Sequence, residues 1–370
     1  MSRKDVPLCF HEDGTFRIMQ IADIQESPMV CEDTLEFLDT ALDRENPDLI
    51  VLTGDQLKGY SVYFHMPGSE GKAAATLHKV MEPIIKHHIP FLVTFGNHDT
   101  EAGLSKQQQM YYYLQYPECI NPIENPEDCG TSCVTISGQN GRPAFAVYLI
   151  DSNANRFAPV LPKQLDWYRE KRDRLALKNG GNCLPSLVFQ HIPVPEFYEF
   201  LQEVPKGTPH AIQAFGSRRG HRYILDQSKV YSGELGEPPC VPEFNSGELN
   251  ALTEKGDVLG LFVGHDHRNS FWGALHGIDA GYTPCCGFNT YGPGANHAVR
   301  MFTLHEANPR HYETKLVSYL DLFGHGPSHP ARDLFLDKTP ATPEQMLSIL
   351  IKTAAVTGVA ACILRRKHRN

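Results

Sequence analysis

The stretch Phe91-Leu92-Val93-Thr94-Phe95-Gly96-Asn97-His98-Asp99 is an apolar run that ends in a glycine and three polar side chains. A continuous apolar run is typical of a buried strand in a parallel sheet, and ligands collect beyond the carboxyl ends of such strands. Because Gly96 lacks a Cβ, the backbone there can turn sharply and approach a bound ion or ligand closely. The stretch alone is also compatible with an ordinary polar turn, so its meaning depends on whether other strands end in the same way.

The segments before this stretch predict a β-α-β-α-β arrangement, which places the chain in the α/β class. The first two strands are each followed by an aspartate, Asp23 and Asp55, and Gly54 precedes the second of these. Apolar runs predict strands at residues 16–22 and 48–53, and apolar residues at helical spacing predict helices at 33–46 and about 72–88. Residues 60–71 predict a surface loop near the strand ends.

Later strands end in histidines. The apolar run at 186–189 is followed by Gln190-His191, and the run at 258–263 by Gly264-His265-Asp266-His267. Between these two, residues 195–254 carry few periodic segments and predict a loop-rich excursion over the same face. We also expect helices at 105–114 and 162–177, and strands at 144–150, 277–281, 298–304 and 312–319.

The predicted strand ends together offer candidate metal ligands. Carboxylate, amide oxygen and imidazole are the groups that bind first-row divalent metals. Two ions about 3.5–4 Å apart share a ligand, for which a carboxylate is suited, and we expect Asp55 on the central early strand to be that bridge. Singly, an aspartate after a strand is more often a helix N-cap, and a lone histidine is more often simply hydrogen-bonded. The conjunction favours a metal site formed by Asp23, Asp55, Asn97, His191, His265 and His267.

These motifs resemble the calcineurin-like metallophosphoesterase superfamily, and within it the intracellular branch related to purple acid phosphatase-like proteins. The resemblance spans about residues 16–304 and implies a four-layer α-β-β-α sandwich with two mixed β-sheets and a metal site at the C-terminal ends of the strands. The motifs that carry it are Asp23-x-Gln25, Gly54-Asp55, Gly96-Asn97-His98-Asp99, His191 and Gly264-His265-Asp266-His267.

The resemblance also implies a role for each site residue. His98 would donate to a phosphate oxygen or protonate the leaving group, and Asp99 would orient the His98 imidazole. A hydroxide bridging two divalent metal ions would attack phosphorus in line. One ion would be held by Asp23, Asp55 and His267, and the other by Asp55, Asn97, His191 and His265.

Gln25 departs from the family pattern, in which the first motif is Asp-x-His. We expect its amide oxygen to bind the first ion, which would favour manganese, iron or magnesium over zinc at that site. The alternative is that Gln25 has left the ion, which would then bind weakly. Lys58 stands where purple phosphatases have a metal-binding tyrosine, so a purple ferric centre is not expected.

Composition limits the function and the compartment. A formal net charge of −9 at pH 7 argues against a non-specific nucleic-acid binder, which needs a basic surface. The ten cysteines form no CxxC pair, and free thiols are expected at Cys129 and Cys133. The N-terminal residues lack the apolar core of a secretory signal, so we expect a cytoplasmic protein with reduced thiols.

The C-terminal region divides the chain into a predicted phosphoesterase domain at 1–325 and a linker with a terminal helix at 326–370. Residues 346–364 are mostly apolar and precede a basic end at 365–369. This segment could span a bilayer, although Lys352 would cost about 2.5–3.5 kcal/mol near its centre. Ser348, Lys352 and Thr353 share one helical side, so a surface-docked or an interfacial amphipathic helix is an equal alternative. A membrane-spanning or an interfacial helix would bring residues 346–369 into contact with a membrane.

Two functions therefore compete. The first is a two-metal enzyme that hydrolyses a small phosphorylated substrate or a phosphoprotein. The second is a catalytically weak or inert interaction scaffold on the same fold. His98, Asp99 and the complete ligand set of the second ion favour the enzyme, whereas Gln25 favours the scaffold.

Overall fold

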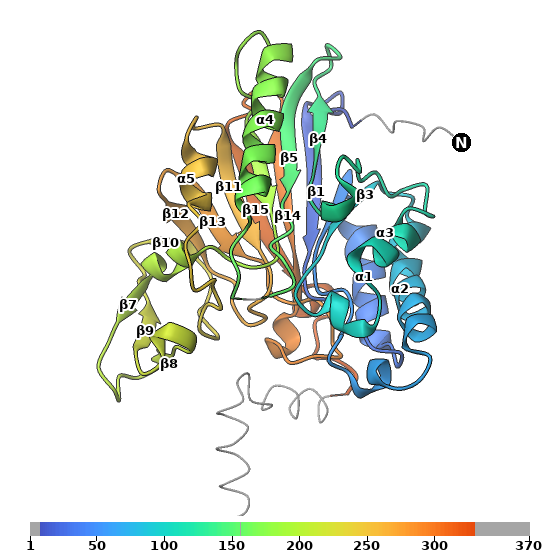
Figure 1. Cartoon of the computed structure of the whole chain (residues 1–370), viewed down its shortest axis with the longest axis vertical. Helices are drawn as coiled ribbons and strands as arrows, with labels where there is room; N and C mark the ends of the chain where they lie inside the picture. Colours follow the sequence, from blue (N-terminus) through green and yellow to red (C-terminus); the bar gives the residue numbers. More distant parts are fainter. Residues whose placement is uncertain (1–7, 156, 330–370) are drawn as a thin grey trace, which may run out of the picture.

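The computed structural model describes residues 8–155 and 157–329, and two large mixed sheets dominate it (Figure 1). The first sheet has the strand order β15-β14-β1-β2-β3. Its three early strands are parallel, with Ile21 opposite Leu52 and Thr53 opposite Thr94, whereas β14 and β15 run antiparallel to their neighbours. The strands are β1 (Thr15–Ile21), β2 (Leu49–Thr53), β3 (Phe91–Thr94), β14 (Ala298–His305) and β15 (Tyr312–Ser318).

The second sheet has the order β10-β12-β13-β11-β6-β5-β4. Its central strands β5, β6, β11 and β13 are parallel, and antiparallel strands flank them at both edges. The strands are β4 (Ser132–Ser137), β5 (Pro143–Leu149), β6 (Ser186–Phe189), β10 (Val230–Ser232), β11 (Val258–Val263), β12 (Trp272–Leu275) and β13 (Ile278–Tyr282).

Side chains that alternate along the strands create the layers. In β2, Leu49 and Val51 belong to a core between the two sheets, whereas Ile50 and Leu52 belong to a core under the helices. This period of two follows from strand geometry. Figure 1 shows α1 (Glu32–Glu45), α2 (Ser69–Lys86) and α3 (Lys106–Tyr113) on one side, and α4 (Pro162–Lys178) and α5 (Glu248–Thr253) on the other. The predicted four-layer sandwich with two mixed sheets is confirmed.

The excursion at 195–254 contains more regular structure than its sequence predicts. A small three-stranded sheet made of β7 (Leu201–Glu203), β9 (Arg222–Leu225) and β8 (Ile212–Gln213) stands beside the main body at the lower left of Figure 1. These strands are two to four residues long, too short to produce a readable apolar alternation. The same span ends in β10 and α5.

Element boundaries elsewhere follow the predictions within a few residues. The helix α2 begins at Ser69, a few residues earlier than expected. Gly68, with a left-handed φ of 81°, is its N-cap. The helix continues through Pro83. The strand β4 is not among the strands that the sequence predicts. It contains Ser, Cys and Thr rather than an apolar run, and it forms by antiparallel pairing with β5. A short helix α6 (Tyr319–Phe323) follows β15 and packs on α1.

The described cysteines, Cys129 and Cys133 among them, are free thiols. Across residues 8–155 and 157–329, no helix has the length and apolar character needed to cross a bilayer. The predicted terminal helix lies outside the described residues, so the division at residue 325 and the membrane contact stay predictions.

Candidate metal centre

The carboxyl ends of strands from both sheets meet at one place. Asp23, Asp55 and Asn97 follow β1, β2 and β3 of the first sheet, and His191 and His265 follow β6 and β11 of the second. Hydrogen bonds join the two groups. The His265 backbone N–H donates to Asp23 Oδ2 at 2.9 Å, and His191 Nδ1 donates to the Thr53 carbonyl at 3.0 Å. Polar residues that are remote in sequence therefore converge where the sheets face each other.

The backbone at these strand ends is unusual in the way a ligand site requires. Asp23, Gln25, Asp55 and His265 all have positive φ, between 41° and 74°, a conformation that non-glycine residues rarely adopt and that clusters at functional sites. A Cβ on Gly96 would lie 2.1 Å from Asp55 Oδ1. The glycine therefore allows the loop after β3 to approach the Asp55 carboxylate, as the sequence predicts.

The candidate ligand atoms are close and buried. His191 Nε2 lies 3.3 Å from Asp55 Oδ2, 4.0 Å from Asp23 Oδ1 and 3.2 Å from His265 Nδ1. His267 Nε2 lies 3.4 Å from Asp23 Oδ1. Asp55, His191 and His265 form a cluster whose ligand atoms all lie within 4.8 Å of one another. The structure therefore brings these predicted residues together.

Each carboxylate is anchored through one oxygen and presents the other to the centre. Asp55 Oδ1 accepts the His98 backbone N–H at 2.8 Å, which leaves Oδ2 facing His191. Asp23 Oδ2 accepts the His265 N–H, which leaves Oδ1 between His191 and His267. Asp55 therefore occupies the position between the two histidine-bearing strands and β1 that a bridging carboxylate would need.

Two histidines are fixed from behind by backbone carbonyls. His191 Nδ1 donates to Thr53 O at 3.0 Å, and His267 Nδ1 donates to Tyr291 O at 2.7 Å. A carbonyl can only accept, so in both rings Nδ1 carries the proton and Nε2 faces the centre. Such partners behind a metal-binding histidine set its tautomer and ring orientation. Tyr291 also stacks on the His267 ring, with the centroids 4.2 Å apart.

The charges of the centre are strongly coupled. Burial alone would lower the pKa of His191, but the neighbouring Asp55 and Asp23 carboxylates outweigh it and raise this pKa to about 9. Burial and the adjacent His191 hold the pKa of His265 well below its usual range. Without a metal, His191 is thus the cation that compensates the carboxylates. A bound metal ion displaces protons from such ligands and supplies the positive charge instead.

Unsatisfied polar atoms indicate that these residues fit a metal. Asp23 Oδ1 and Asn97 Oδ1 are buried and accept no hydrogen bond from protein groups. A buried oxygen without a partner costs free energy unless another group, such as a cation, satisfies it. Asn97 lies between Gly96 and His98, whose backbone bonds hold this turn against Asp55 and Asp99. Oxygen and imidazole donors in a buried cluster suit divalent ions.

The predicted role of Asp99 is wrong. Its Oδ2 accepts the backbone N–H groups of Asp55 and Gly96, both at 2.8 Å, and its Oδ1 accepts the Leu57 N–H at 3.1 Å. Asp99 is fully buried and ties the loop after β2 to the loop after β3. The carboxylate that contacts His98 is Glu101, whose Oε2 lies 2.7 Å from His98 Nδ1. Both Asp99 oxygens face the backbone of these loops, and Glu101 contacts the His98 ring instead.

Gln25 lies at the centre and makes two contacts. Its Nε2 donates to Asp55 Oδ2 at 3.0 Å, and its Oε1 accepts from the Tyr60 hydroxyl at 3.0 Å. Tyr60 is hydrogen-bonded to Thr290 Oγ1 at 3.1 Å and packs edge-on against the His98 ring. The sequence alone did not indicate Tyr60, which lies two residues after Lys58 and outside the motif spacing of a tyrosine ligand. Lys58 Nζ instead donates to the Asn289 carbonyl.

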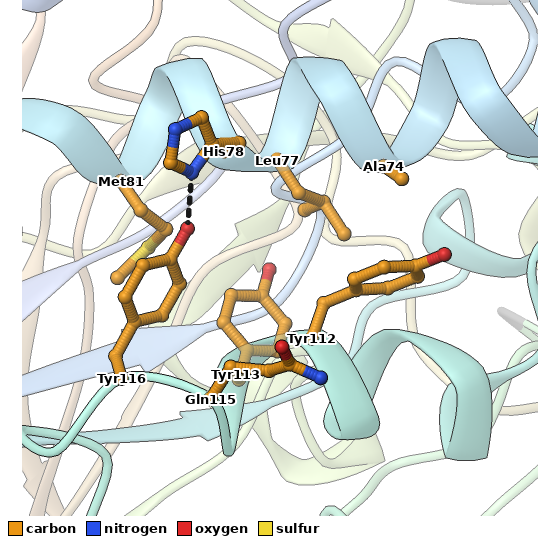
Figure 2. Close-up of a pocket in the computed structure, with 8 residues that line it drawn as sticks. All are labelled: Ala74, Leu77, His78, Met81, Tyr112, Tyr113, Gln115 and Tyr116. Atoms are coloured by element: carbon orange, nitrogen blue, oxygen red, sulfur yellow. Dashed lines mark hydrogen bonds between the residues drawn. The ribbon is translucent and has the colours of Figure 1, made fainter.

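A surface groove of about 350 Å³ lies between α2 and α3, away from this centre (Figure 2). The Tyr116 hydroxyl is hydrogen-bonded to His78 Nδ1 at 2.8 Å. Figure 2 shows Met81 of α2 beside Tyr116, and Leu77 facing Tyr112 and Tyr113. The groove contains none of the candidate metal ligands. It is therefore not part of the strand-end site.

Comparison with known proteins agrees with this geometry. The family model of the calcineurin-like phosphoesterases matches residues 16–269. The chain is 28% identical over 329 residues to "Probable inactive purple acid phosphatase 14" of Arabidopsis thaliana, covering 77% of this chain and 74% of that protein. It is 25% identical over 299 residues to "Phosphatase DCR2" of Saccharomyces cerevisiae, covering 70% of this chain and 45% of that protein.

A solved structure supports the same fold. The crystal structure of a dimetal phosphatase from Danio rerio superposes with a TM-score of 0.50 at 16% identity, covering 82% of this chain and 99% of that one. Because the family model matches more than half of the residues, the chain belongs to the calcineurin-like phosphoesterase family.

Proposed function

We propose that this chain is a dinuclear metal-dependent phosphoesterase. The observation that carries the proposal is the approach of Asp23 Oδ1, Asp55 Oδ2, His191 Nε2 and His265 Nδ1 to one buried point from strands of two sheets. When bound, two divalent ions would offset charge on phosphoryl oxygens and lower the pKa of an attacking water. A first ion would be held by Asp23, Gln25, Asp55 and His267, and a second by Asp55, Asn97, His191 and His265.

His98 is the proposed phosphate contact. Its Nδ1 lies against Glu101, which leaves Nε2 as the nitrogen that can donate to a phosphate oxygen or to the leaving group. A quarter of the side chain is exposed, whereas the Asp55 side chain is 1% exposed. His98 therefore stands between solvent and the buried ligands. An amide oxygen from Gln25 at the first ion would favour manganese, iron or magnesium over zinc.

The direct test is hydrolysis after controlled metal loading. The full chain is stripped with a chelator, reloaded with Mn²⁺, and assayed on p-nitrophenyl phosphate and its bis ester. Asp55→Ala should lower turnover more than about 100-fold, since even partners behind the ligands cost 10–100-fold. Asp173→Ala removes a carboxylate whose side chain is 61% exposed on α4, and should leave turnover unchanged. Equal rates in the two variants, or no turnover with any divalent ion, would overturn the proposal.

An interaction scaffold is the second candidate. It is favoured by the name of the Arabidopsis relative, a probable inactive phosphatase, and by the replacement of the usual histidine with Gln25. A scaffold of this kind would still bind metal through the residues described above but would hydrolyse neither ester. The choice of substrate, a cytoplasmic location and membrane contact through residues 346–369 remain proposals, for which partner and substrate screens of the full chain are the test.

A further inference from the structure

The hydroxyl groups of Tyr60 and Thr290 lie directly behind the Gln25 amide. Tyr60 OH is 3.0 Å from Gln25 Oε1 and 3.1 Å from Thr290 Oγ1. The amide nitrogen of Gln25, Nε2, is 3.0 Å from Asp55 Oδ2. Gln25 and Thr290 are 1% and 2% exposed, and the Tyr60 hydroxyl is held between them although 42% of the Tyr60 surface is exposed. The three side chains form a short hydrogen-bonded chain that ends on the proposed bridging carboxylate.

Resting on the proposed function, we propose that this hydroxyl pair lets the Gln25 amide turn either end toward the centre. The nitrogen faces Asp55 when the first ion is absent, and the oxygen faces that ion when it is bound. Tyr60 and Thr290 are thus positioning residues for the first ion. This role differs from that of a ligand, because neither hydroxyl needs to touch the ion.

The donor and acceptor pattern explains why both orientations are satisfied. An ionised carboxylate only accepts, so without an ion the amide must present its N–H to Asp55. Its oxygen then accepts the Tyr60 proton, and Tyr60 accepts from Thr290. An ion attracts the amide oxygen, and a half-turn of the amide exchanges its nitrogen and oxygen positions with little change in shape. Tyr60 then accepts from the amide nitrogen and donates its proton to Thr290.

Thr290 therefore matters mainly in the loaded state. When the ion is bound, the Tyr60 proton has Thr290 Oγ1 as its acceptor. Without that oxygen the Tyr60 proton would lose its acceptor on the protein, which favours the amide orientation of the empty state. When the ion is absent, Tyr60 donates to Gln25, and Thr290 is dispensable for that bond. The structure thus predicts that Thr290→Val weakens the first ion selectively.

The test is Mn²⁺ binding to the chelator-stripped full chain, measured by calorimetry and by electron paramagnetic resonance. Exchange coupling between two Mn²⁺ ions reports the loaded first site, and a single-ion signal reports its loss. Thr290→Val should raise the Kd of the first ion up to about tenfold, the net contribution of one hydrogen bond, and change the second by less than twofold. Thr290→Ser keeps the hydroxyl and should bind like the wild type, and Thr290→Ala is the substitute if the Val variant does not fold.

A double-mutant cycle with Tyr60 distinguishes an effect of the Tyr60–Thr290 hydrogen bond from an effect of side-chain packing. In a Tyr60→Phe background the hydroxyl that needs Thr290 is gone, so Thr290→Val should no longer change the Kd of the first ion. Tyr63→Phe, in the helical turn Val62–His65 next to Tyr60, is the matched control and should leave both ions unchanged. A tenfold effect that persists with Tyr60→Phe, or no effect of Thr290→Val at all, would overturn the inference.

Failure of the inference and failure of the proposed function give different results. Ester hydrolysis by the wild type, together with an unchanged Kd of the first ion in Thr290→Val, would refute only the positioning role. The predicted coupling in Mn²⁺ binding without any hydrolysis would support the positioning role and refute the enzyme. An absence of Mn²⁺ binding would refute both.

Discussion

Asp99→Asn and Glu101→Gln distinguish a carboxylate that holds the backbone from one that contacts His98, the proposed phosphate contact. Asp99 accepts three buried backbone N–H groups, two through Oδ2 and one through Oδ1. Asparagine keeps one acceptor oxygen, and its amide nitrogen would face an N–H donor. Glu101 is different, because 43% of its side chain is exposed and it contacts one imidazole nitrogen of His98.

The cost of Asp99→Asn can be worked from these contacts. A hydrogen bond to a charged acceptor contributes about 1.5–3 kcal/mol, and an N–H left buried without a partner costs about 1–3 kcal/mol. Burial and the nearby Asp55 charge raise the pKa of Asp99, so the neutral amide recovers part of this loss. We therefore expect about 2–4 kcal/mol of lost unfolding free energy. For Glu101→Gln we expect less than about 0.5 kcal/mol, which is usual for exposed substitutions.

The assay is urea unfolding of the chelator-treated protein at pH 7, followed by ester hydrolysis of the folded variants with Mn²⁺. Glu101→Gln should keep stability and lower turnover, since a neutral amide replaces the carboxylate that holds His98 Nδ1 at 2.7 Å. Asp99→Asn should lose stability. An Asp99→Asn protein that is as stable as the wild type but inactive would refute the reasoning and restore Asp99 as the partner of His98.

Three further predictions follow from single contacts. Burial raises the pKa of Glu248 to about 8. The stabilisation from its proton is therefore complete below about pH 4.5, and the free energy of unfolding falls by about 1.4 kcal/mol per pH unit from there to about pH 8. Glu248→Gln should remove this slope in urea unfolding measured across that pH range, and an unchanged slope would contradict the assignment to Glu248. Gly96→Ala places a Cβ 2.1 Å from Asp55 Oδ1 and should abolish Mn²⁺ binding measured by calorimetry, so normal affinity would contradict the packing argument. Gln25→His should shift metal preference toward zinc in competition binding, and an identical metal profile would argue against ligation by Gln25.

The sequence alone determined the parallel core and the ends of its strands. Continuous apolar runs such as Leu49–Thr53 and Val258–Val263 can be read without tertiary context, because a strand buried on both faces needs an apolar side chain at nearly every position. The polar residues that follow these runs indicated the candidate ligands, because the carboxyl ends of parallel strands meet at one edge of a sheet. Short strands such as Ser132–Ser137 could not be read, because pairing with a neighbour, and not their own composition, makes them strands.

Only the tertiary structure decided which neighbour each polar side chain contacts. Asp99 is adjacent to His98 in sequence, yet its oxygens are occupied by backbone N–H groups of two loops, and Glu101 contacts the imidazole because the turn Asp99–Ala102 is a 3₁₀-helix that places residues three apart on one side. Tyr60 and Thr290 are 230 residues apart and meet behind Gln25 only because the two sheets face each other. Residue spacing encodes local direction, whereas hydrogen-bond partners across loops depend on how the layers pack.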